Sequence, residues 1–223
     1  MTTTCDDVMA ELESLGDAAV FKRNAKNGAG ENQFGVKLGD LRKVAKRIKS
    51  NPELAFELWA TGNMDAQLLA ILLLEPKKLT REQLETLVTE GTIPQVADWV
   101  NSYVVKHHPE KEACRETWMN ADDPMLQRAG WSLTGGRLQR DADGLDIPAI
   151  LDRIEAEGAD ADEAAQWTMN FALIYAGTHH ADHRERAIAI GEKLGMFRDY
   201  PTSKGCVSPF APIAIPEMVK RLP

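Results

Sequence analysis

The chain repeats one local pattern from end to end: a helix start signal, an apolar stretch with helical spacing, and a short turn. Asn51 stands directly before Pro52, Thr80 is followed three residues later by Gln83, and Asp146 precedes an isoleucine and a proline. Side-chain oxygens at such positions accept hydrogen bonds from the free N–H groups of a first helical turn, and proline fits there because it has no N–H. No segment combines β-branched residues, period-two alternation and hairpin turns. The pattern predicts an all-α protein.

The arrangement of these helices predicts a repeat architecture. Short turns favour antiparallel neighbours, and stacked helical pairs build solenoids. The stretches "NPELAFELWATGNMDAQLLAILLLEPKKLT", "HPEKEACRETWMNADDPMLQRAGWSLT" and "DIPAILDRIEAEGADADEAAQWTMNFALIYAG" each read as a helix, a turn and a second, more apolar helix. We expect HEAT-like repeats that form one curved α-solenoid domain over residues 1–223, with a capping extension at 196–223. The expected helices include 94–107, 147–157 and 216–221.

Composition limits the classes of function. A chain of 223 residues that is 43% hydrophobic is long enough to bury a core, and it has no apolar run of membrane-helix length. Cys5, Cys114 and Cys206 are scattered, so neither a disulfide framework nor a cysteine zinc site is expected. The net charge of -8 argues against nonspecific binding of polyanions over the whole surface but allows a local basic patch. We expect a cytoplasmic protein.

Two local patterns are candidate contact surfaces. In "DDPMLQRAGWSL", Arg128 and Trp131 lie within or beside an apolar helical stripe, so Arg128 is either a surface residue whose stem covers apolar neighbours or a functional cation facing a groove. Further upstream, Arg42, Lys46 and Lys49 follow i, i+4, i+7 spacing within a cluster of six cations. They could contact a nucleic-acid backbone, or they could form a solvated helix face.

Several of these pieces, in this order, resemble one family. "HPEKEACRETWMNADDPMLQRAGWSL", the later "AAQWTMNFAL" and the upstream "NQFGVKLGDLRKVAKRIKSNPELAFELWATGNMDAQLLAILLL" are similar to the AlkD-type DNA alkylation-repair glycosylases, which are built from HEAT-like repeats. The resemblance covers about residues 30 to 180. It implies a DNA glycosylase that releases N3- or N7-alkylated purines from double-stranded DNA by hydrolysis, acts as a monomer and needs no metal or organic cofactor.

The resemblance also implies the site residues. The family arginine in "QRA" falls on Arg128 and a family tryptophan on Trp167, while the "GW" segment places Trp131 beside DNA. The family acid matches Asp98 in one register, with Trp99 beside it, and falls on Asn101 in another. In the Asp98 register, Pro94 replaces a family tryptophan. The implied catalytic residues are Asp98, Arg128 and Trp167, and the implied DNA contacts are Trp99, Trp131, Arg42, Lys46, Lys49 and Lys204.

The chemistry explains these residue types. An alkylated purine is already a good leaving group, so a carboxylate such as Asp98 needs only to stabilise positive charge on the sugar and to position water. The faces of Trp99 and Trp167 can pack on a cationic sugar or base, and Arg128 suits a phosphate. A curved stack of helices would bring these groups together. Structural roles are the alternative: a solvated Asp98 and core tryptophans at 99, 131 and 167.

The remaining alternatives concern the tail and the overall function. Lys204, Gly205 and Ser208 could donate to phosphate, or the tail could only cap the last repeat. The "HHADH" spacing at 179–183 matches no metal site that we would defend. The second function hypothesis is a non-catalytic HEAT-like module that binds DNA structures or a protein partner. The net charge and the missing tryptophan favour the module, whereas Arg128, Trp167 and Asp98 favour the enzyme.

Overall fold

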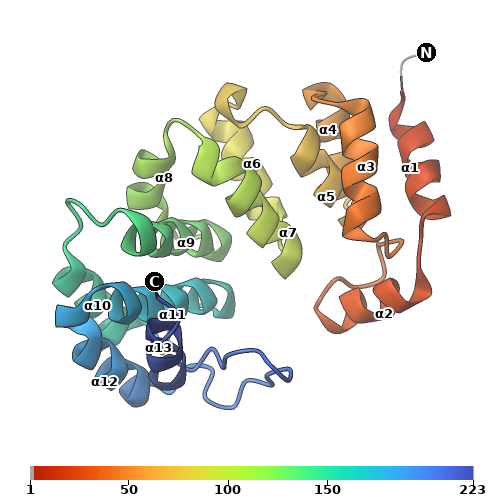
Figure 1. Cartoon of the computed structure of the whole chain (residues 1–223). Coiled ribbons are helices and arrows are strands. Elements are labelled where there is room, and N and C mark those ends of the chain that lie inside the picture. The colour runs from red at the N-terminus through yellow and green to blue at the C-terminus, as the bar shows by residue number, and fades with distance from the viewer. Residues whose placement is uncertain (1–2, 223) are drawn as a thin grey trace. The chain divides into compact units, whose positions relative to one another are not determined.

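The structure, a computed structural model, describes residues 3–222 as helices joined by short turns (Figure 1). Within that range the only β pairing is a single bridge between Gly16 and Val36, so the all-α prediction is confirmed. The chain divides into two compact units, Met1–Lys111 and Glu112–Pro223. None of the helices described is both long enough and apolar enough to cross a bilayer.

The first unit is organised around one buried helix. Helix α5 packs against α3, α4 and α7, and nearly all of its side chains are buried, which is typical of a central helix. Figure 1 shows α3, α4 and α5 side by side. The elements of this unit are α1 (Cys5–Ser14), α2 (Ala18–Lys26), α3 (Leu38–Ile48), α4 (Pro52–Ala60), α5 (Met64–Leu73), a 3-10 turn (Pro76–Lys78), α6 (Arg81–Glu90) and α7 (Pro94–Trp99).

The start signals that were read from the sequence form the expected caps. Asn51 accepts from the N–H of Leu54 at the start of α4, and Thr80 accepts from the N–H of Gln83 in a reciprocal capping box. Each cap satisfies N–H groups that have no partner inside the helix, which fixes where the helix begins.

A buried carboxylate holds the turn that precedes α3. Asp65 is 0% exposed and accepts from the backbone N–H groups of Phe34, Gly35 and Val36, at 2.7, 2.9 and 3.1 Å. Gly35 has a φ of +78°, and a Cβ there would lie 2.6 Å from the backbone nitrogen of Phe21. The "FGV" segment and the acid in "NMDA" therefore contact each other for a structural reason: the carboxylate accepts hydrogen bonds from three N–H groups that the turn leaves unpaired.

The expected helix over 94–107 is not one regular α-helix. The α-helical part ends at Trp99 and is followed by a π-helical turn, Val100–Val104, and a 3-10 turn, Val105–His107. Val100, Val104 and Val105 are all buried. A π turn allows residues five apart to share one face, so Val100 and Val105 both reach the core. Helical periodicity predicted the segment, but not this local widening.

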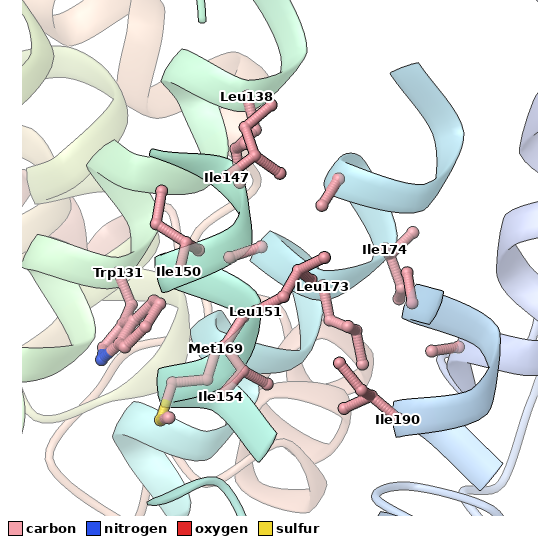
Figure 2. Close-up of a cluster of buried hydrophobic side chains, with 14 of the residues drawn as sticks. Trp131, Leu138, Ile147, Ile150, Leu151, Ile154, Met169, Leu173, Ile174 and Ile190 are labelled. Carbon is pink, nitrogen blue, oxygen red and sulfur yellow. The ribbon is translucent and has the colours of Figure 1, made fainter. Parts of the chain in front are cut away.

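The second unit has two long helices at its centre. Helices α9 and α11 pack along each other, and α13 packs on both α11 and α12 (Figure 1). Figure 2 shows the core that they share with α10, including Leu151, Met169 and Leu173. The elements are α8 (Lys111–Trp118), α9 (Pro124–Arg140), α10 (Ile147–Glu157), α11 (Glu163–His179), a 3-10 turn (Ala181–His183), α12 (Arg184–Leu194) and α13 (Ala211–Val219).

The prediction for the last helix was wrong in its bounds. The sequence analysis predicted a helix over residues 216–221, whereas α13 begins at Ala211 and contains Pro216 in its interior. Burial of Ala214 and Ile215 against α11 and α12 outweighs the hydrogen bond that this proline cannot make. The expected extension 196–223 therefore contributes a helix to the second unit.

Candidate functional site

A cation and two aromatic rings form a cluster in the first unit. The guanidinium carbon of Arg42, on α3, lies 5.1 Å from the ring centroid of Trp99, at the end of α7. Arg42 Nη2 donates to the hydroxyl oxygen of Tyr103 at 3.2 Å, and the Trp99 and Tyr103 rings are 5.0 Å apart. Tyr103 is 38% exposed. The cluster therefore holds a guanidinium at the surface by stacking and by one hydrogen bond.

The cations of α3, with Lys37 before it and Lys49 after it, divide into those that form an ion pair and those that do not. Lys37, Lys43 and Arg47 are ion-paired, with Asp17, Asp40 and Glu11 respectively. The predicted contact residues Arg42, Lys46 and Lys49 form no ion pair with any residue between 3 and 222, and all three are exposed. The i, i+4, i+7 spacing therefore identified the three cations whose charge no carboxylate neutralises.

The Lys37 ion pair shows how strongly the first group is neutralised. The Lys37 ammonium, together with the N–H groups of Val20 and Ala19, lowers the pKa of Asp17 to about 2. The same contact raises the pKa of Lys37. Lys37 is therefore paired with the carboxylate that caps the start of α2, whereas Lys46 forms no ion pair within residues 3–222.

The acid that was matched to the family lies next to this cluster. Asp98 is an exposed residue in the last turn of α7, directly before Trp99. Asn101, which the second register selected, is half-buried in the π-helical turn. Pro94 occupies the first turn of α7, a position where proline is favoured because the N–H that it lacks would have no partner inside the helix. Short π-helical turns often accompany functional sites, so the placement of Asp98 and Asn101 around one is notable.

Arg128 of the second unit is not the surface residue that its spacing favoured. Its side chain is 8% exposed, and its Nη1 donates to the carbonyl oxygen of Ala164 at 3.2 Å. Ala164 lies in the first turn of α11, one turn before Trp167. Arg128 therefore ties α9 to the segment of α11 that carries Trp167.

Trp131 is a core residue. It is 1% exposed and belongs to the hydrophobic cluster drawn in Figure 2, together with Ile150 and Ile154. The guanidinium carbon of Arg153 lies 5.4 Å from its ring centroid and covers one face. Because the indole is enclosed, the core interpretation of Trp131 applies, and we do not assign it a contact with DNA.

Trp167 is the centre of an aromatic cluster. Its ring centroid lies 5.1 Å from Phe171, 5.2 Å from Phe197 and 5.4 Å from Tyr200. Trp167 is half-buried, whereas Tyr200 is exposed. Lys204, the predicted tail contact, is exposed and forms no ion pair within the described chain.

In the first unit the structure brings Arg42 together with Trp99. In the second unit Arg128 of α9 contacts Ala164 of α11, which lies one turn before Trp167. The sequence analysis missed Tyr103. Its signal was present, since Tyr103 follows Trp99 by four residues, but its contact with Arg42 spans 61 residues and depends on the packing of α3 near α7.

These features describe a helical-repeat protein in which an exposed arginine stacks on an aromatic ring. A family model described as "DNA alkylation repair enzyme" matches residues 8–210, so the chain belongs to this family. Two proteins described as uncharacterized are similar along most of their length. The one from Listeria monocytogenes is 25% identical over 93% of this chain and 94% of its own, and the one from Listeria innocua is 26% identical over 86% and 87%.

A solved structure gives the closer description of the fold. It is described as a new family of proteins related to the HEAT-like repeat DNA glycosylases with affinity for branched DNA structures. The match has a TM-score of 0.80 and 27% identity and covers 98% of this chain and 94% of that chain. The HEAT-like fold that the sequence predicted is thereby confirmed.

Proposed function

We propose that this protein binds DNA through its sugar-phosphate backbone, with a preference for branched structures. The observation that carries the proposal is the Arg42 cluster: a guanidinium stacked on Trp99, hydrogen-bonded to Tyr103, and without a carboxylate partner among residues 3–222. The affinity of the similar structure for branched DNA supports the same reading.

Stacking suits this guanidinium for phosphate. An arginine on an aromatic face keeps its full charge, and because the side chain is already ordered, less conformational entropy is lost on binding. Its remaining N–H donors are free to form the paired hydrogen bonds that phosphate oxygens accept. Lys46 adds a second cation one turn further along α3, and Lys49, with a φ of +67°, directly follows the last helical residue. Backbone contacts of this kind position a duplex without reading its sequence.

The net charge of the chain fits a structure-selective ligand. At -8, the protein as a whole repels a polyanion, so binding depends on a local positive surface. A branch point concentrates phosphates in a small volume, which increases the attraction to a small cationic patch relative to a straight duplex. If Arg42, Lys46 and Lys49 each neutralise one phosphate, the logarithm of the affinity falls with the logarithm of the salt concentration with a slope of about -2.7.

Fluorescence anisotropy with a four-way junction and a linear duplex of the same sequence tests this proposal. We expect tighter binding of the junction. Arg42→Ala should weaken junction binding and reduce the salt slope by about 1. Lys43→Ala is the matched control, since Lys43 is an exposed neighbour on α3 that is paired with Asp40 at 2.8 Å. If Arg42→Ala and Lys43→Ala behave alike, or the wild type binds neither DNA, the proposal is wrong.

A second candidate function is hydrolysis of the glycosidic bond of N3- or N7-alkylated purines. Membership of the alkylation-repair family and the exposed carboxylate of Asp98 beside Trp99 favour it. Here Asp98 stabilises the oxocarbenium-like sugar and accepts a proton from the attacking water, and the neutral alkylated base leaves. Trp167 offers a ring face to positive charge. Arg128 acts as a positioning residue, because it holds the turn from which Trp167 projects.

A base-release assay on methylated duplex DNA, with N3-methyladenine and N7-methylguanine measured separately, tests this candidate. Asp98→Asn should abolish release and leave DNA affinity intact. Asn101→Asp decides the alternative register, because an acid restored at the family position would raise release. If folded wild type binds DNA but releases neither base, the protein is a binding module. If Asp98→Asn releases bases as fast as wild type, Asp98 has no catalytic role.

A further inference from the structure

A row of aromatic side chains continues along α11 beyond Trp167. Trp167, Phe171, Tyr175 and His179 are spaced four residues apart and therefore lie on one helical face. Successive ring centroids are 5.1, 6.1 and 6.2 Å apart. All four side chains are half-buried. The row is continuous over three turns of the helix.

The row is separate from the face that α11 contributes to the core. The fully enclosed positions of α11 include Ala165, Met169, Ala172, Leu173 and Ala176. The aromatic residues lie beside this face and pack on the core only partly. An unbroken series of half-buried rings along one side of α11 offers a surface on which flat aromatic groups can stack.

Two glycines of α9 make room beside the row. A Cβ at Gly135 would lie 3.2 Å from Cδ2 of Tyr175, so the tyrosine ring rests on the α9 backbone. A Cβ at Gly136 would lie 2.8 Å from Nη2 of Arg140, so the guanidinium folds over that position. The "GG" of α9 therefore accommodates both a ring and a cation, which bulkier residues would displace.

Arg140 supplies charge next to the ring of Tyr175. The Arg140 guanidinium covers Gly136, and the Tyr175 ring rests on Gly135, the preceding residue of α9. Burial raises the pKa of the Tyr175 hydroxyl, and the positive charge of Arg140 acts in the opposite direction. Arg140 is exposed and donates to Gln139 at 3.3 Å, and it forms no ion pair with any residue from 3 to 222. A cation without a carboxylate partner thus borders the aromatic row.

We infer that this row, from Phe171 to His179 with Arg140 beside it, is a binding track for unpaired nucleotides of DNA. Rings and cations together match the chemistry of a single strand, because bases stack on aromatic side chains while the guanidinium contacts phosphate. A fully paired duplex does not fit the track, since its base faces are covered by neighbouring pairs. The inference rests on the proposed DNA binding and extends it to a second surface, with single-stranded segments as the ligand.

Two DNAs of equal length, a closed duplex and a duplex with a single-stranded arm, test the track in an anisotropy assay. We expect Tyr175→Leu and Arg140→Gln each to weaken binding of the armed DNA by about fivefold or more, with the closed duplex unaffected. Tyr175→Phe keeps the ring and should bind as the wild type does. Arg186→Gln, at an arginine of the same unit that is paired with Asp152, is the charge control.

A spectroscopic readout separates stacking from a loss of folded protein. 2-Aminopurine placed in the arm is quenched when it stacks, so wild type and Tyr175→Phe should lower its fluorescence and Tyr175→Leu should not. Equal weakening on both DNAs, or unchanged quenching by Tyr175→Leu, overturns the track. If one of these two results is found while Arg42→Ala still weakens binding of the armed DNA, only the track is wrong. If the wild type binds neither DNA, the proposed DNA binding is wrong as well.

Discussion

The buried carboxylate of Asp65 provides a stringent stability test of the first unit. Its side chain is 0% exposed, and its two oxygens accept three backbone hydrogen bonds from Phe34, Gly35 and Val36. Asp65→Ala removes the acceptor and leaves the N–H groups of Phe34, Gly35 and Val36 without this partner. Asp65→Asn keeps one acceptor oxygen but turns an amide donor toward the same N–H groups.

The expected size follows from these three contacts. Hydrogen bonds to a charged group contribute roughly 1.5–3 kcal/mol each, and the contributions overlap because the three donors share one carboxylate. We expect Asp65→Ala to lower the free energy of unfolding by about 4 kcal/mol and Asp65→Asn by about 2–3 kcal/mol. Against a typical total of about 5–15 kcal/mol, either loss is large.

Guanidinium denaturation followed by circular dichroism measures the change. Asp40→Asn is the matched control, since the Asp40 carboxylate pairs with a lysine that is 81% exposed and should change stability by less than about 1 kcal/mol. Hydrogen exchange gives a local readout, because the amides of residues 34–36 should lose protection in Asp65→Asn. A midpoint equal to that of Asp40→Asn, together with unchanged protection of these amides, would refute the reasoning.

Three further results are expected. Trp131→Ala should lower the free energy of unfolding by about 3–5 kcal/mol in thermal or denaturant unfolding, and should change DNA affinity only in proportion to the folded fraction; a selective loss of affinity with intact stability would contradict its place in the core. Gly35→Ala should cost more than about 1 kcal/mol, since φ is +78° and the new Cβ would meet the Phe21 nitrogen at 2.6 Å; an unchanged melting temperature would contradict this. Burial, with a smaller effect of His180, lowers the pKa of His179 below 6.5, so as the pH falls through 6.5 the unfolded chain binds a proton more readily than the folded protein and stability falls. His179→Gln should therefore reduce the dependence of the melting temperature on pH between 7.5 and 5.5. The same pH dependence in wild type and His179→Gln would show that His179 does not cause it.

Local signals in the sequence were sufficient for most of the fold. Caps at Asn51 and Thr80 fixed helix starts because the oxygen and the N–H groups that it binds are only three residues apart. The signals failed where long-range packing set the geometry. The π turn after Trp99 brings Val100 and Val105 to the core, and burial of Ile215 extends α13 across Pro216.

The candidate site divides in the same way. Helical spacing selected Arg42, Lys46 and Lys49, which form no ion pair in the described part of the chain, although α3 ends at Ile48 and Lys49 follows it with a positive φ. Spacing did not reveal that Trp99 and Tyr103 hold the Arg42 guanidinium, because that contact joins α3 to a turn 61 residues away.

Local patterns and residue order were enough to predict the helical class, the helix starts at Asn51 and Thr80, and the family, since each depends on residues that are neighbours in the chain or on their order along it. Which of two chemically similar side chains is enclosed and which is accessible depends on how the helices pack around it. Trp131 and Trp167 both stand in helices with mixed apolar faces, yet one is sealed in the core and the other leads an aromatic row. Burial is a property of the elements packed around a side chain, so no local pattern carries it.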